Sequence, residues 1–167
     1  MVWFDERALV RLLPVGSGKL TSVAGVGFAA MFLITVASMG YSIYGPAILQ
    51  TLSGLSALQA GYTVASESVA WTLTALMVAH LTDPWPGRMI RLGAFLVVVA
   101  MVIGALAFPS GSVIGAIATG LILGSGFGIS YSFTSQRILA TLSGAERGTG
   151  AASMTTIRLT GSAAGAA

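Results

Sequence analysis

The sequence has no cysteine and a single histidine, His80, among its 167 residues. The absence of cysteine excludes disulfide frameworks, thiolate metal sites and cysteine nucleophiles, and one histidine cannot supply a multi-histidine ligand set. No glycine run follows a strand pattern or ends in Gly-Lys-Ser, so nucleotide binding has no support. We therefore expect neither a metal nor another cofactor.

Charged residues are also scarce, with 8 Lys and Arg and 5 Asp and Glu, or 8% of the chain. A soluble globular domain carries about 25% charged residues, so this chain lacks the polar groups to cover a water-exposed surface. Hydrophobic residues make up 55%, and 22 glycines allow helices to pack closely in lipid. The basic residues are scattered, which argues against nucleic acid as a partner. The composition predicts an all-α integral membrane protein in a lipid bilayer.

Two long stretches, residues 20–66 and 92–136, contain no charged residue. One crossing needs about 20 residues, so each stretch is long enough for more than one helix. We expect Gly45-Pro46 to end the first helix, and Pro109-Ser110-Gly111 to separate the third helix from the fourth. The chain then divides into a cytoplasmic lead-in at residues 1–19 and a transmembrane domain at residues 20–167. Five transmembrane helices are predicted at about residues 21–44, 60–81, 90–108, 112–135 and 148–167, the last one truncated.

Lysine and arginine mark one side of this predicted domain. They fall before the first helix, between the second and third, and between the fourth and fifth, at Arg7, Arg11, Lys19, Arg88, Arg91, Arg137 and Arg147. The two turns on the other side carry no charge. By the positive-inside rule we expect a cytoplasmic N-terminus and a multi-pass protein of the cell's inner (plasma) membrane.

Glu67 lies roughly 10 Å inside the second predicted helix at 1.5 Å per residue. A carboxylate within a membrane is costly unless it is paired, hydrated or protonated. With Thr63, Trp71 and Thr74 it forms a polar stripe on one helix face, which we expect to face water or substrate. Burial favours the neutral form of a carboxyl group, so one interpretation is a proton-exchanging or cation-binding residue. The alternative is an interfacial glutamate wetted from the extracytoplasmic side.

Arg158 lies near the middle of the fifth predicted helix, where an unpaired arginine is costly. We interpret it as an anion or substrate contact, as a partner for a carboxylate such as Glu67, or as a structural residue that extends toward the cytoplasmic interface. Glycines at four-residue spacing indicate close helix packing on the last two helices. They are Gly120, Gly124 and Gly128 on one helix and Gly161 and Gly165 on the other.

Three passages of the sequence carry a resemblance to a known family. Residues 44–61 contain YGPAILQ and then GLSALQAG, residues 81–93 contain LTDPWPGR and then RLG, and residues 146–167 contain ERGTGAAS and then RLTGSAAGAA. Together they resemble the second half of a major facilitator superfamily transporter, in particular the fourteen-helix drug/proton antiporter branch. Residues 1–19 resemble the cytoplasmic connection between the two halves of such a transporter.

The resemblance implies five helices of a six-helix transporter half, with the binding site between the two halves near the membrane midplane. It implies a proton-coupling role for Glu67 and a substrate cavity that includes Tyr41, Trp71, Tyr131 and Arg158. It also implies a cytoplasmic gating loop that contains Asp83, Gly87 and Arg88.

The expected function is therefore that of a partial secondary active transporter and not of an enzyme. It would couple a proton to the efflux of small amphipathic compounds or drugs by alternating access. The missing partner would be an N-terminal half or a second copy of the chain. The alternative is a small membrane scaffold or assembly protein that acts through glycine-rich helix pairing, without transport of its own.

Overall fold

The computed structural model describes residues 19–81, 84–144 and 146–167. Within these ranges the chain is all-helical and contains no strand, which confirms the predicted all-α class. The elements are α2 (Val23–Met39), the π-helical turn η1 (Gly40–Tyr44), α3 (Gly45–Ser53), α4 (Ala57–Val78), α5 (Pro86–Ala107), α6 (Val113–Ala140) and α7 (Glu146–Ala166).

Three segments of the described chain have the length and apolar composition needed to cross a membrane. They are Val23–Ser53, Pro86–Ala107 and Val113–Ala140. Helices α4 and α7 contain 22 and 21 residues, but α4 includes Glu67 and many hydroxyl side chains, and α7 begins with Glu146 and Arg147. The described helices indicate a membrane protein, whereas five crossings stay a prediction.

The first helix does not end at Gly45-Pro46, so that prediction is wrong. The chain remains helical from Val23 to Ser53. A proline inside an α-helix removes a hydrogen bond, and its ring clashes with the carbonyl group four residues earlier, here that of Ser42. The helix widens into the π-helical turn η1 directly before this point, and Pro46 then occupies the first turn of α3. The wider turn changes the hydrogen-bond register and accommodates the proline.

Serine caps and two glycines set the remaining boundaries. The hydroxyl oxygen of Ser56 accepts a hydrogen bond from the backbone N–H of Gln59, whose side chain accepts one in return from the Ser56 N–H. This capping box starts α4 at Ala57, ahead of the predicted residue 60. Gly54 and Gly111 follow α3 and α5 with φ angles of 66° and 64°, a left-handed conformation that glycine adopts without steric cost.

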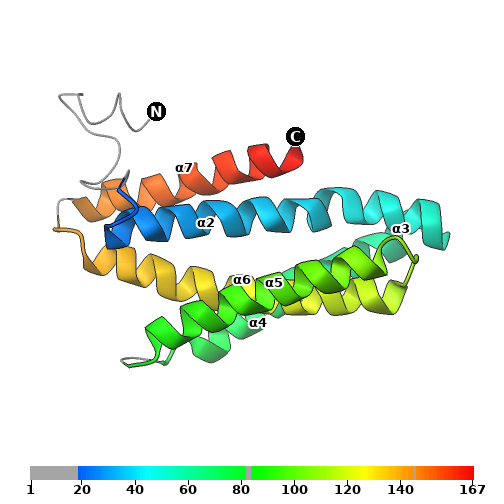
Figure 1. Ribbon diagram of the computed structural model, residues 1–167, viewed down its shortest axis with the longest axis horizontal. Helices are drawn as coiled ribbons and strands as arrows, with labels where there is room; N and C mark the ends of the chain where they lie inside the picture. The colour runs from blue at the N-terminus through cyan, green and yellow to red at the C-terminus, as the bar shows by residue number, and fades with distance from the viewer. Residues whose placement is uncertain (1–18, 82–83, 145) are drawn as a thin grey trace.

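Helix α6 lies at the centre of the bundle, where it packs against α4, α5 and α2, while α7 packs mainly on α2 (Figure 1). A Cβ atom added at Gly124 would meet the carbonyl oxygen of Glu67, and one at Gly128 would lie 2.7 Å from that of Trp71. On α7, a Cβ atom at Gly165 would lie 2.7 Å from the carbonyl oxygen of Val36. Both glycine faces thus contact neighbouring helices, as the four-residue spacing predicts.

Apart from Arg158 in the middle of α7, the basic residues of the described chain gather at one end of the bundle. Figure 1 shows the starts of α2, α5 and α7 at the same end. This end carries Lys19, Arg88, Arg91, Arg137 and Arg147. The turns at Gly54 and Gly111 lie at the opposite end and carry no charge. The asymmetry agrees with the predicted sidedness of the loops.

Candidate functional site

The carboxylate of Glu67 lies inside the bundle. Glu67 is only 9% exposed, because α4 packs closely against α6 here. The hydroxyl group of Ser42, in η1, donates a hydrogen bond of 2.7 Å to Glu67 Oε2. Thr63, one turn earlier in α4, is also buried. Of the polar stripe predicted on this helix, Thr63 and Glu67 are therefore covered by neighbouring helices, whereas Trp71 and Thr74 are partly exposed.

Tyr41, also in η1, connects this turn to α4 and α6. Its hydroxyl group lies 3.1 Å from the carbonyl oxygen of Thr63 in α4 and 3.0 Å from that of Ala116 in α6, so its one proton is shared between two acceptors. Its ring meets Phe108 edge-on at a centroid distance of 5.8 Å. Tyr41 is 3% exposed, and it holds η1 in place beside the glutamate.

Three aromatic side chains form a cluster one helical turn from Glu67. Trp71 of α4 lies 4.6 Å from Phe127 and 6.3 Å from Tyr131, measured between ring centroids. Phe127 and Tyr131 of α6 stack with an interplanar angle of 14° at 5.8 Å. Two of the predicted cavity residues, Trp71 and Tyr131, therefore lie together, and Phe127 completes the cluster.

Arg158 of α7 closes this cluster on one side. Its guanidinium carbon lies 5.6 Å from the ring centroid of Trp71 and 5.6 Å from that of Tyr131. At these distances the negative faces of the rings attract the cation. The structure thus places Arg158 against aromatic rings. The hydrogen bond to the Glu67 carboxylate comes from Ser42 and not from Arg158.

Glycines of α6 set the position of Glu67 and Trp71. Because Gly124 and Gly128 have no side chain, the backbone of α4 approaches α6 directly at these two residues. Gly120 gives the same close approach to the hydroxyl groups of Tyr41 and Ser66. The glycine spacing therefore fixes the register between the glutamate on α4 and the aromatic rings on α6.

The predicted gating loop is described only in part. Asp83 lies outside the described residues. Arg88 lies over the ring of Trp85, with its guanidinium carbon 5.9 Å from the ring centroid. Gly87 lies beside the guanidinium group of Arg137 in α6.

Two residues of the site were not identified from the sequence. Phe127 precedes Tyr131 by four residues on one helix, a spacing that signals a shared face. Ser38 follows Thr35 by three residues and Ser42 follows Ser38 by four, which marks a polar face on the first helix. Neither pattern indicates which neighbouring helix that face meets.

Among the residues that the structure describes, no group of three or more His, Asp or Glu side chains is placed to hold a metal ion. Comparison of the chain with protein-family models, curated proteins and solved structures finds no match. The site is therefore interpreted from its own geometry.

Proposed function

We propose that this chain forms part of a secondary active transporter that couples a proton to the export of small amphipathic compounds. The observation that carries the proposal is the buried Glu67 carboxylate, one helical turn from an aromatic cluster on the same helix. Ionisable groups inside membrane helices are rare, and those that occur mark proton relays and substrate pathways.

The contact between Ser42 and Glu67 suits a carboxyl group that gains and loses a proton. A serine hydroxyl group donates to an ionised carboxylate, as the 2.7 Å contact allows, and it accepts from a protonated one. The same pair of atoms therefore satisfies both protonation states. Ser42 also lies in a π-helical turn, an element often found at functional sites.

The aromatic cluster provides the substrate surface in this proposal. The partly exposed rings of Trp71 and Tyr131, which pack against the buried Phe127, offer apolar faces with negative potential. Such faces attract flat amphipathic compounds and organic cations. Arg158 occupies two of these faces, so a cationic substrate competes with the guanidinium group for them. Competition of this kind links substrate binding to the position of α7.

The wider proposal follows the sequence resemblance to the drug/proton antiporter branch of the major facilitator superfamily. It includes five membrane crossings, a cytoplasmic N-terminus and an inner (plasma) membrane location. A second half, either an N-terminal half or another copy of the chain, completes the cavity, and rocking of the halves alternates access to it.

The scaffold alternative has less support from the packing. Gly120, Gly124 and Gly128 already contact α4, and Gly161 and Gly165 already contact α2. These faces are therefore covered within the chain and do not present a small-residue surface to another protein.

Dye efflux driven by a proton gradient in inverted membrane vesicles tests the proposal. The Glu67→Gln variant is made in a form of the protein that includes any further residues its gene encodes before and after this sequence. We expect Glu67→Gln to abolish efflux in this form, while membrane insertion persists. Glu146→Gln is the matched control, because Glu146 lies at the start of α7 and outside the Glu67 site. Efflux by the Glu67→Gln variant at the unmodified rate would remove the proton role. Efflux by the 167-residue chain alone would show that copies of the chain form the cavity.

A further inference from the structure

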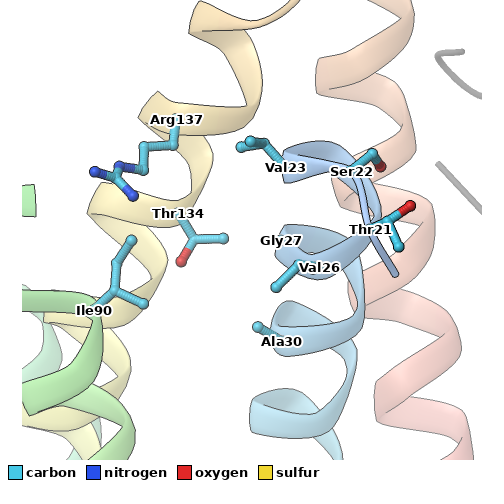
Figure 2. Close-up of a pocket in the computed structure, with 9 residues that line it drawn as sticks. All are labelled: Thr21, Ser22, Val23, Val26, Gly27, Ala30, Ile90, Thr134 and Arg137. Atoms are coloured by element: carbon cyan, nitrogen blue, oxygen red, sulfur yellow. The ribbon is translucent and has the colours of Figure 1, made fainter. Parts of the chain in front are cut away.

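A cavity of about 300 Å³ lies between the start of α2 and helices α5 and α6, at the end where the basic residues gather. Its wall is mostly apolar and includes Val26 and Ala30 of α2 and Ile90 of α5. Its polar lining residues are Thr134 and Arg137 of α6 and, at the start of α2, Thr21 and Ser22. No acidic side chain lines it among the described residues. Figure 2 shows these side chains around the space.

The hydroxyl group of Thr134 has no hydrogen-bond partner in the described chain, although the residue is only 5% exposed. Other threonines in these helices satisfy their hydroxyl groups locally. Thr35 donates to the carbonyl oxygen of Met31 and Thr119 to that of Gly115, at 2.7 Å and 2.8 Å. In Figure 2 the methyl group of Thr134 points toward α2, and its oxygen lies on the side of Ile90, at the edge of the cavity. A buried hydroxyl group in this position calls for a partner from outside the chain.

Arg137 lies one turn nearer to the end of α6, roughly 4.5 Å along the helix axis from Thr134. Its side chain is exposed, and its guanidinium group lies beside Gly87 at the start of α5. The cavity is therefore more polar at its rim and more apolar toward its inner end. A cation lies at the rim, a neutral hydroxyl group lies one turn deeper, and apolar side chains follow.

A phospholipid has the same order of groups. Its phosphate lies at the membrane surface, its ester carbonyl groups lie just below, and its acyl chains follow. We propose that this cavity binds an anionic phospholipid, with the phosphate at Arg137, an ester oxygen accepting a hydrogen bond from Thr134, and one acyl chain along Val26, Ala30 and Ile90. Basic pockets between membrane helices are known to hold anionic lipid headgroups. The proposal requires a membrane location but not transport.

A second cavity of nearly equal size allows a comparison with the proposed lipid cavity within the same molecule. It has a volume of about 290 Å³ and lies between η1, α5 and α6, beside Tyr41, Gly104 and Thr119. No basic residue lines it, and the hydroxyl group of Thr119 is already bound to its own helix. Size and apolar walls are therefore common to both cavities, whereas the cation and the unpartnered hydroxyl group belong to the first.

Native mass spectrometry of the full 167-residue chain in detergent tests the proposal. The chain is titrated with dioleoyl phosphatidylglycerol or with dioleoyl phosphatidylcholine. We expect one phosphatidylglycerol to bind more tightly than phosphatidylcholine. Arg137→Gln should weaken that binding by about tenfold or more, because it removes a charge-assisted hydrogen bond. Thr134→Val preserves the side-chain shape and should weaken the binding of both lipids.

Matched controls separate the site from general charge and packing effects. Arg147→Gln removes an exposed arginine outside the cavity, and Thr72→Val removes an exposed hydroxyl group that is bound to Ser68. Both should bind phosphatidylglycerol as the unmodified chain does. Ala30→Leu fills the cavity without changing its charge, so it should weaken binding. Circular dichroism of each variant checks that helical content is retained.

Three results would overturn the proposal. The first is equal affinity for the two lipids. The second is equal loss of phosphatidylglycerol binding in Arg137→Gln and Arg147→Gln. The third is displacement of the lipid by millimolar glycerol 3-phosphate, which would show a site for a free phosphate ester that does not depend on the acyl chain.

Discussion

The hydroxyl group of Ser42 donates a 2.7 Å hydrogen bond to Oε2 of Glu67, and so joins the π-helical turn η1 to the middle of α4. The two residues are 25 positions apart in the chain. Ser42 lies within the widened turn, where side chains lie at different angles around the helix from those in an α-helical turn, and this places its hydroxyl group toward α4.

Replacement of Ser42 by alanine tests this contact. We expect Ser42→Ala to lower proton-coupled efflux by about tenfold and to lower the free energy of unfolding by roughly 1–3 kcal/mol, since it leaves a buried carboxyl oxygen without its hydrogen-bond partner. Vesicle efflux and chemical unfolding in detergent measure the two effects. Ser38→Ala is the control, because that hydroxyl group bonds only to the carbonyl oxygen of Thr35 in its own helix. Equal efflux in the two variants would show that the contact has no part in transport.

The glycine face of α6 makes a prediction about stability. In Gly124→Ala, the added methyl group meets the carbonyl oxygen of Glu67, and we expect a loss of about 1–3 kcal/mol from overpacking. Gly61→Ala on α4 places its methyl group in open space, so we expect it to gain about 0.5–1 kcal/mol from helix propensity. Unfolding in detergent, followed by circular dichroism, measures both. A change in unfolding free energy of the same sign in both variants would contradict the close packing of α4 on α6 at Gly124.

The contact of Arg158 with the aromatic rings predicts a measurable coupling. A double-mutant cycle of Arg158→Gln with Trp71→Leu should give an interaction energy of about 0.5–1 kcal/mol, the usual strength of a cation–π pair. The same cycle with Leu159→Ala in place of Arg158→Gln is the control, since Leu159 is exposed on α7. A coupling of zero in the first cycle would mean that the guanidinium group does not hold the cluster together.

The start of α7 has a pH-dependent cap. The hydroxyl group of Ser143, at 2.7 Å, and its backbone N–H, at 3.2 Å, both donate to Glu146 Oε2, and they lower the pKa of that carboxyl group below its ordinary value of 4.5. Since the folded pKa is lowered, the stabilisation is complete above the ordinary pKa and is lost as pH falls through the lowered one. Ser143→Ala should return the pKa of Glu146 toward 4.5, as followed by NMR titration. Thr141→Val should leave the pKa unchanged, because its hydroxyl group contacts Ile138.

Local features of the fold could be predicted from the sequence because they depend on neighbouring residues. Apolar runs located the helices, and Gly111 marked the turn between α5 and α6. The prediction that the first helix ends at Pro46 was wrong because a proline breaks a helix only where the preceding turn is a regular α-helical one. Here the preceding turn is the π-helical η1, which changes the hydrogen-bond register and lets the helix continue.

The site could be predicted only in part, because its contacts join separate helices. The spacing of Glu67 and Trp71 on one helix indicated a shared face, but no spacing along the chain indicates that Phe127 meets Trp71. That contact depends on how closely Gly124 and Gly128 let two backbones approach. The cavity beside Thr134 likewise arises only when α2, α5 and α6 come together.

The continuous helix from Val23 to Ser53 has 31 residues, which is about 46 Å at 1.5 Å per residue. The hydrocarbon core of a bilayer is about 30 Å thick, so the helix is too long to cross it upright with both ends at the surface. This hydrophobic mismatch is relieved by tilt, or by leaving the last turns, with Gln50, Thr51 and Ser53, among the headgroups. Both the tilt of this helix and the depth of Glu67 therefore depend on the length of the lipid chains around it.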